Sequence, residues 1–249
     1  MKKLSVIKIG GNIIENESEL TKFLTLFSQI TEPKILVHGG GKKANQVLEK
    51  MGIAPKMVKG RRITDSESLD VAIMVYGGLT NKKIIAKLQA LECNAIGMSG
   101  ADGNSIYAHK RPVKDIDFGF AGDVDGVNAN LIGKLLTLEL IPVFCALTHD
   151  KKGQLLNTNA DTVASELAIG MSTNFETTLY YCFELNGVLQ NFENKNSVIK
   201  KIDSDSYKNL VSEGCIADGM LPKMQNCFHA LNNSVKEVRI GNLLSLIHI

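Results

Sequence analysis

Short apolar runs alternate along this chain with segments whose apolar residues recur at helical spacing. Leu4–Ile9 and Lys34–His38 are rich in β-branched residues and end at glycines, as buried strands typically do. Between them, residues 18–30 carry apolar side chains every three or four positions, which predicts a helix. This alternation predicts a mainly parallel sheet that is covered by helices on both faces.

The same pattern continues to the end of the chain. Further strands are expected at Asn94–Ser99, Ile141–Leu147, Thr177–Phe183 and Val235–Ile240, and further helices at about 42–51, Asn128–Glu139, Asn159–Ile169, Asp205–Ser212 and Gly219–Leu231. Thr64 and Glu67 have the spacing of a capping box, which predicts the start of a long helix that ends near Leu91. Residues 105–127 are rich in Gly and Asp and show no helical period. We expect short antiparallel strands over a site there.

Composition excludes several classes of protein. The 249 residues are 44% hydrophobic, which suits one large α/β domain or two intimate lobes, with a lobe boundary near 170–176. A net charge of +2 without a long basic run argues against a nucleic-acid partner. The five cysteines are scattered, odd in number and without a C-x-x-C pair, so we expect reduced, buried thiols and no metal ligands.

No targeting or membrane-spanning segment is evident. The apolar stretch after Met1-Lys2-Lys3 is interrupted by Lys8 and glycines, unlike a signal peptide. The apolar run at 135–147 contains Glu139 and Pro142 and is too short to cross a bilayer. We therefore expect a cytoplasmic protein without a membrane partner.

Two glycine-rich turns follow the first two expected strands. Gly39-Gly40-Gly41-Lys42 links a strand to a helix, where free N–H groups and the helix dipole favour an anion. The match to a Walker A loop fails, and an ordinary tight turn is the alternative. Gly10-Gly11 is a weaker example of the same signal. Lys8 and Lys223, beside these and other glycines, would supply point charges for a phosphate, although a lone lysine is more often solvated.

Two polar motifs complete the candidate site. Asn157–Asp161 precedes an expected helix, where Asn159 suits an N-cap and Asp161 suits the first turn. Such a loop also lies where α/β proteins place ligands. Arg61-Arg62 is either a solvated basic pair or an anchor for a carboxylate. His38 is expected to be structural.

Taken in order, six segments resemble the amino acid kinase family, and within it the kinases of N-acylglutamates. They are Ile7–Gly11, His38–Gly41, Gly60–Thr64, Gly119–Val127, Asn157–Asp161 and Asp218–Lys223. Each is weak alone, but the ordered set spans nearly the whole chain. The resemblance implies an open three-layer αβα sandwich in a single domain over residues 1–249. Its acylglutamate-binding lobe would cover about 1–170 and its ATP-binding lobe about 171–249.

The resemblance also implies roles for individual residues. Lys8 and Lys223 would flank the transferring phosphoryl group as catalytic residues, and Asp161 would orient both. Arg62 would hold an α-carboxylate and Asn157 the amide end of the substrate. The full substrate-binding set would be Gly40, Gly41, Arg62, Asn157 and Asn159. The nucleotide, ATP with Mg²⁺ on its phosphates, would contact Gly10, Gly11, Gly41, Glu184, Asp218, Gly219 and Met220.

The reaction implied by the resemblance is ATP-dependent phosphorylation of the γ-carboxylate of N-acetyl-L-glutamate in arginine biosynthesis. That carboxylate is ionised at pH 7, so the site needs positioning and charge neutralisation rather than a general base. N-succinyl-L-glutamate is an alternative substrate. Carbamate kinase and UMP kinase are more distant alternatives, and a non-catalytic amino-acid sensor on the same fold belongs to a different class.

Two stretches depart from the family pattern. Phe183–Gly187 replaces a Ser-Asp-Val-Ser-Gly-like run, so Glu184 is expected to take the place of an aspartate near the nucleotide. Pro222 precedes Lys223 directly and is expected to hold Leu221 in extended geometry.

The resemblance implies a homodimer formed through the long helix that begins near Ser66. The first expected strand begins at about Lys3. We therefore expect this chain to lack the extra N-terminal helix of arginine-sensitive, hexameric relatives, and we expect no inhibition by arginine.

Overall fold

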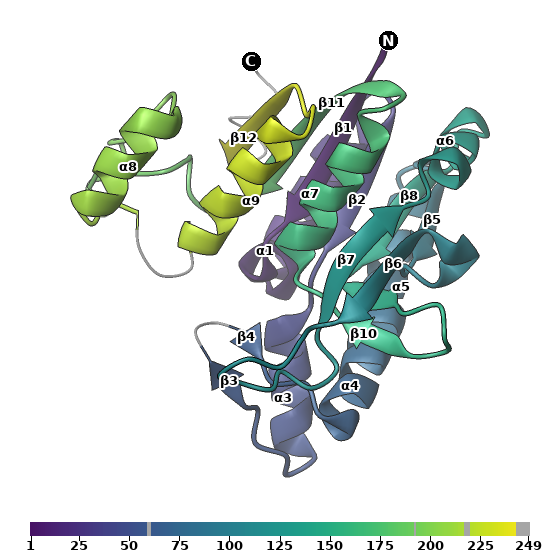
Figure 1. Ribbon diagram of the computed structural model, residues 1–249. Coiled ribbons are helices and arrows are strands. Elements are labelled where there is room, and N and C mark those ends of the chain that lie inside the picture. Colours follow the sequence, from purple (N-terminus) through teal and green to yellow (C-terminus); the bar gives the residue numbers. More distant parts are fainter. Residues whose placement is uncertain (59–60, 192, 217–219, 243–249) are drawn as a thin grey trace.

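A six-stranded parallel sheet lies at the centre of the protein (Figure 1). The computed structural model describes residues 1–58, 61–191, 193–216 and 220–242. The strand order is β12-β11-β1-β2-β8-β5, and every neighbouring pair is parallel. The strands are β1 (Lys2–Ile9), β2 (Lys34–His38), β5 (Ala95–Met98), β8 (Ile141–Cys145), β11 (Phe175–Cys182) and β12 (Glu237–Gly241).

Helices cover both faces of this sheet, which confirms the predicted three-layer αβα architecture. One layer holds α6 (Ala129–Thr137), α7 (Ala160–Met171), α8 (Ser204–Ser212) and α9 (Met220–Asn232). The other holds α1 (Gly11–Glu15), α2 (Glu17–Ser28) and α5 (Asn81–Gln89). Side chains alternate along a strand. Leu4 and Val6 of β1 therefore pack in the α7 layer, whereas Ile7 and Ile9 pack in the α2 layer.

A second, four-stranded sheet lies beside the first. It contains β6 (Ile106–Lys110), β7 (Gly122–Val127), β9 (Leu147–His149) and β10 (Leu155–Asn157) in the order β10-β9-β6-β7. The β6–β7 pair is antiparallel, as predicted. The expected strand at 141–147 divides into β8 and β9, which belong to different sheets. A short antiparallel pair, β3 (Met57–Val58) and β4 (Arg61–Arg62), was not predicted.

The predicted long helix is present, but its middle is π-helical. It consists of α4 (Ser66–Ala72), η1 (Ile73–Thr80) and α5, and α3 (Gly41–Lys50) packs against α4. The predicted Thr64 cap is wrong, because Asp65 is the N-cap and accepts from the Ser68 N–H at 2.9 Å. Thr64 is instead buried, and its N–H donates to the Phe118 carbonyl.

Pro222 lies inside α9, so the expectation of an extended Leu221 is also wrong. The proline occupies the first turn of the helix, where a backbone N–H has no intrahelical acceptor and its loss costs little. The five cysteines are free thiols, and four of them are buried. Among the described residues, no helix is both long and apolar enough to cross a membrane.

Candidate active site

One carboxylate holds two lysines that are far apart in the sequence. Lys8 Nζ lies 2.7 Å from Asp161 Oδ1, and Lys223 Nζ lies 2.7 Å from Asp161 Oδ2. Lys8 comes from the carboxyl-terminal end of β1, Asp161 from the first turn of α7, and Lys223 from the first turn of α9. The three side chains are 14–17% exposed, so their charges are only partly screened by water.

The two lysines determine the charge of this carboxylate. Burial would raise the pKa of Asp161, but the attraction of Lys8 and Lys223 outweighs it and lowers the pKa to about 2. Burial lowers the pKa of Lys223, and the nearby carboxylate opposes that shift. The Tyr181 hydroxyl donates to the Asp161 carbonyl at 2.9 Å, and Lys223 Nζ lies 4.7 Å from the Tyr181 ring centroid. The Asp161 carboxylate therefore stays ionised at neutral pH and holds both lysine amino groups in place.

Two helix N-termini point to the same edge of the sheet. Gly11 begins α1 directly after β1, and Gly41 begins α3 directly after β2. Unpaired N–H groups at such positions favour anions. Gly10 was expected to contribute as well, but its N–H donates to the Cys182 carbonyl at 2.8 Å and is not free for a phosphate. At Gly40, a Cβ would lie 2.6 Å from the Tyr76 ring, so only glycine fits against this aromatic wall.

Arg62 is buried with one nitrogen left unpaired. Its Nη2 donates to the Gly41 carbonyl at 3.0 Å and to Asn45 Oδ1, whereas Nη1 is buried without a hydrogen-bond partner among the described residues. A buried donor without a partner is costly unless a ligand satisfies it. The geometry fits a carboxylate that accepts from this guanidinium.

Most of these groups line one cavity of about 340 Å³. Its walls include Lys8, Asp161, Arg62 and Tyr76, whereas Lys223 contacts it only through Asp161. The predicted substrate-binding residues Gly40, Gly41, Arg62, Asn157 and Asn159 all line it. Asn157 donates its Nδ2 to Thr64 Oγ1 at 2.9 Å. The Asn159 side-chain oxygen caps α7 by accepting from the Asp161 N–H at 2.7 Å, so its amide nitrogen is the group left to face the cavity.

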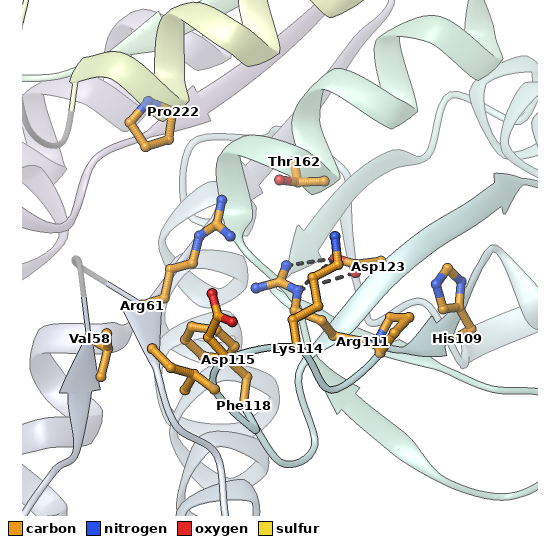
Figure 2. Close-up of a pocket in the computed structure, with 12 residues that line it drawn as sticks. Val58, Arg61, His109, Arg111, Lys114, Asp115, Phe118, Asp123, Thr162 and Pro222 are labelled. Carbon is orange, nitrogen blue, oxygen red and sulfur yellow. Dashed lines mark hydrogen bonds and ion pairs between the residues drawn. The ribbon is translucent and has the colours of Figure 1, made fainter.

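A larger cavity of about 820 Å³ adjoins the first and shares Arg61 and Arg111 with it (Figure 2). Arg61 reaches into this space from β4 toward Thr162 and Pro222. Arg111 follows β6 and forms a bidentate pair with Asp123, with an Nη2–Oδ1 distance of 2.6 Å. Lys114, Asp115 and His109 also line it. Thr162 and Pro222 in its lining are the neighbours of Asp161 and Lys223, so this cavity adjoins the lysine cluster.

The predicted nucleotide-binding residues lie in several places. Glu184 follows β11, is exposed and accepts from Asn12 Nδ2. Met220 begins α9 and packs partly against the core. Asp218 and Gly219 lie outside the described residues. The roles of these four residues stay predictions.

Sequence reasoning missed two residues that line the cavities, Tyr76 and Arg111. Tyr76 lies within a helix whose apolar pattern gives no sign of a site. Arg111 lies in a loop whose only signal is the Gly- and Asp-rich composition of the region. Arg61 was predicted as part of either a solvated basic pair or a carboxylate anchor, and the structure places it in the walls of both cavities.

Comparison with known proteins agrees with this geometry. The sequence profile of the amino acid kinase family matches residues 3–242. The chain belongs to the amino acid kinase family. This amino acid kinase is 53% identical to the acetylglutamate kinase of Cytophaga hutchinsonii, over 100% of this chain and 95% of that protein. It is 51% identical to the acetylglutamate kinase of Phocaeicola vulgatus, over 96% of this chain and 93% of that protein.

A solved structure is similar over the whole length of this amino acid kinase. The crystal structure of smu.665 from Streptococcus mutans matches with a TM-score of 0.84 and 27% identity, covering 98% of this chain and 97% of that chain. The family and the names of the relatives make this chain a kinase, which uses ATP as the family does. The predicted membership of the family is confirmed.

Proposed function

We propose that this kinase transfers the γ-phosphoryl group of ATP to the γ-carboxylate of N-acetyl-L-glutamate, forming an acyl phosphate in arginine biosynthesis. The observation that supports this most is a single cavity with two kinds of cation. Lys8 and Asp161 line it, with Lys223 bound to the second oxygen of Asp161, and Arg62 lines it with an unpaired Nη1. A dicarboxylate can place one carboxylate at the lysine and the other at the arginine.

The residues of the site then have simple roles. Arg62 binds the α-carboxylate, and Asn157 and the Asn159 amide hold the acylamino group. The γ-carboxylate is already ionised and attacks without a base, while Lys8 and Lys223 neutralise the oxygens of the phosphoryl group in transit. Gly11 and Gly41 donate their N–H groups to phosphate oxygens. Asp161 keeps both ammonium groups in place and stays ionised, because its pKa is about 2.

Magnesium would arrive with the nucleotide. The described residues contain no group of three or more His, Cys, Asp or Glu side chains that could hold a metal ion, and Asp161 is already paired with both lysines. Mg²⁺ binds readily through substrate phosphates with few protein ligands. When bound, it would neutralise charge on the phosphate chain.

The direct test is product formation. The purified chain is incubated with MgATP and N-acetyl-L-glutamate, ADP release is followed, and the acyl phosphate is trapped with hydroxylamine as a hydroxamate. Equal amounts of ADP and hydroxamate are expected. ADP release without hydroxamate, or no turnover at all, would contradict the proposal, and the latter is the outcome expected of a non-catalytic amino-acid sensor.

N-succinyl-L-glutamate is a second candidate substrate, because Arg61 and Arg111 line both cavities. The extra carboxylate of a succinyl group would be costly to bury without a cation, and these arginines lie where the cavity widens. A pocket built for that charge would bind an acetyl group poorly, so discrimination should be large in one direction. The two values of kcat/KM, measured in parallel, decide between the substrates. Cytoplasmic location stays a prediction.

A further inference from the structure

A chain of three polar side chains crosses the ends of three adjacent strands. Lys42 Nζ donates to Asn12 Oδ1, and Asn12 Nδ2 donates to Glu184 Oε1. Lys42 follows β2, Asn12 follows β1 and Glu184 follows β11, and these strands are neighbours in the sheet. Ligands of open α/β sheets bind at this carboxyl edge. None of the roles proposed above uses Lys42 or Asn12.

Lys42 and Lys8 line the same cavity but come from different elements and contact different partners. Lys8 points into the α7 layer, where it meets Asp161. Asn12, the partner of Lys42, belongs to α1, whose Ile13 packs in the α2–α5 layer. Lys8, Gly11, Lys42 and Asp161 nevertheless line one cavity. A phosphate chain over Gly11 would therefore have two lysines in the same cavity.

The Lys42 side chain lies close over Gly11. A Cβ built on Gly11 would be 3.9 Å from both Cγ and Cδ of Lys42, so the lysine stem covers the first residue of α1. An ammonium group carries three N–H donors. One is donated to Asn12, and no other acceptor contacts Lys42 Nζ among the described residues. Two donors are thus left for a ligand in the cavity beside Gly11.

We propose that Lys42 binds the β-phosphate of the nucleotide and that Asn12, held by Glu184, is the residue that positions it. The proposal rests on ATP being the donor in the proposed function. Lys8 and Lys223 flank the transferring phosphoryl group beside Asp161. Lys42 Nζ is linked through Asn12 to Glu184 in the loop after β11, which belongs to the proposed ATP-binding lobe, and so meets the phosphate that stays on ADP.

Nucleotide binding tests the role of Lys42 without any turnover. Calorimetry with MgADP and with the magnesium complex of a non-hydrolysable ATP analogue is carried out on the full chain, Lys42→Ala and Lys43→Ala. Lys43 is the matched control, since it is adjacent and pairs with Gln46 outside the cavity. Loss of a charge-assisted phosphate contact should weaken both nucleotides about ten-fold in Lys42→Ala. Lys43→Ala should bind both as the wild type does.

Several outcomes would overturn the assignment. Wild-type affinity in Lys42→Ala, or an equal loss in Lys43→Ala, would show that Lys42 makes no specific contact. A loss confined to the ATP analogue would place Lys42 on the transferred phosphate and not on the β-phosphate. Failure of the wild-type chain to bind either nucleotide would overturn the proposed function itself. If instead the wild type binds both nucleotides and Lys42→Ala binds them equally well, only the role of Lys42 is overturned.

A double-mutant cycle tests the positioning role of Asn12. Asn12→Ala should raise the KM for ATP less than Lys42→Ala does and leave kcat nearly unchanged. The double variant should be no weaker than Lys42→Ala alone, because Asn12 acts only through the lysine. Additive effects of the two substitutions would show that Asn12 acts independently of Lys42. The fold of each variant is checked by its thermal unfolding midpoint.

Discussion

At the residue scale, the proposed chemistry depends on two lysine amino groups held 2.7 Å from one carboxylate. Lys8→Ala and Lys223→Ala should each lower kcat by about 10²–10³-fold, as loss of a preorganised transition-state donor does. Arginine at either position should not restore the rate, because a planar fork does not replace a point charge. Steady-state kinetics on folded variants measure this. A kcat within a few-fold of wild type for either alanine variant would exclude the proposed role.

Arg62 should affect binding rather than the chemical step. Arg62→Ala should raise the KM for the acylglutamate about ten-fold or more, since it removes a buried, charge-assisted contact to a carboxylate that does not react. The KM for ATP should change little. Arg61→Ala is the control for general loss of positive charge at the cavity. A fall in ATP affinity instead would place Arg62 beside the nucleotide.

His38 links stability to pH from inside the core. It is fully buried, with Nδ1 2.7 Å from the Gly39 carbonyl and Nε2 3.0 Å from Asn81 Nδ2, and burial lowers its pKa to about 4. The unfolded chain, with a histidine pKa of about 6.5, takes up the proton first. The free energy of unfolding should therefore fall as pH drops from about 6.5 to about 4. Below about pH 4 this histidine should cause no further loss, because it is protonated in both the folded and the unfolded state.

Urea unfolding at a series of pH values, compared between wild type and His38→Gln, measures that linkage. The variant should lose part of the slope between pH 6.5 and 4, whatever its stability at pH 7. An identical slope of stability against pH in both proteins would show that His38 does not cause the pH dependence.

At the scale of elements, the side chain of Lys34 caps the C-terminal end of α2. Lys34 Nζ donates to the carbonyls of Phe27, Ser28 and Ile30 at 2.8, 2.9 and 2.7 Å. The last carbonyls of a helix have no intrahelical donor, so this side chain satisfies them in place of a C-terminal glycine. Lys34→Met keeps the apolar stem but removes the donor. It should lower the free energy of unfolding by about 1–3 kcal/mol.

Chemical denaturation of Lys34→Met and of Lys22→Met gives the comparison. Lys22 forms an exposed ion pair with Glu19 on the same helix, and its loss should cost less than about 1 kcal/mol. Equal effects of the two substitutions would mean that water can replace Lys34 as the hydrogen-bond donor to the three carbonyls without loss of stability.

At the scale of the whole molecule, the homodimer stays a prediction. The π-helical segment η1 leaves Met74 and Leu79 exposed, 53% and 39% respectively, on the long helix expected to form the interface. Met74→Asp should convert a dimer into a monomer, because a charge in an apolar contact is costly to bury. Light scattering measures the mass. Leu138→Asp, on an exposed residue just after α6, should leave it unchanged. A monomeric wild type would contradict the prediction.

Local patterns in the sequence determined the sheet, its layers and most of its elements. Alternating apolar runs and helical periods report backbone geometry within a few residues, so Lys34–His38 and the helix at 204–212 could be placed closely. The glycine turns after β1 and β2 were visible for the same reason. The family resemblance, not these turns alone, implied that Lys8 and Arg62 belong to one site.

Contacts between distant segments were decided only by the tertiary structure. Periodicity does not show that the π-helical turn sets Tyr76 against Gly40, or that Arg111 from a loop joins Arg61 at the cavity wall. It also could not choose Asp65 over Thr64 as the helix cap, because Thr64 is taken into pairing with the segment at 118–120. Which residue caps a helix or lines a cavity depends on which polar groups remain unpaired after the chain has packed. Packing brings together residues that are far apart in the sequence, and no local sequence pattern indicates those contacts.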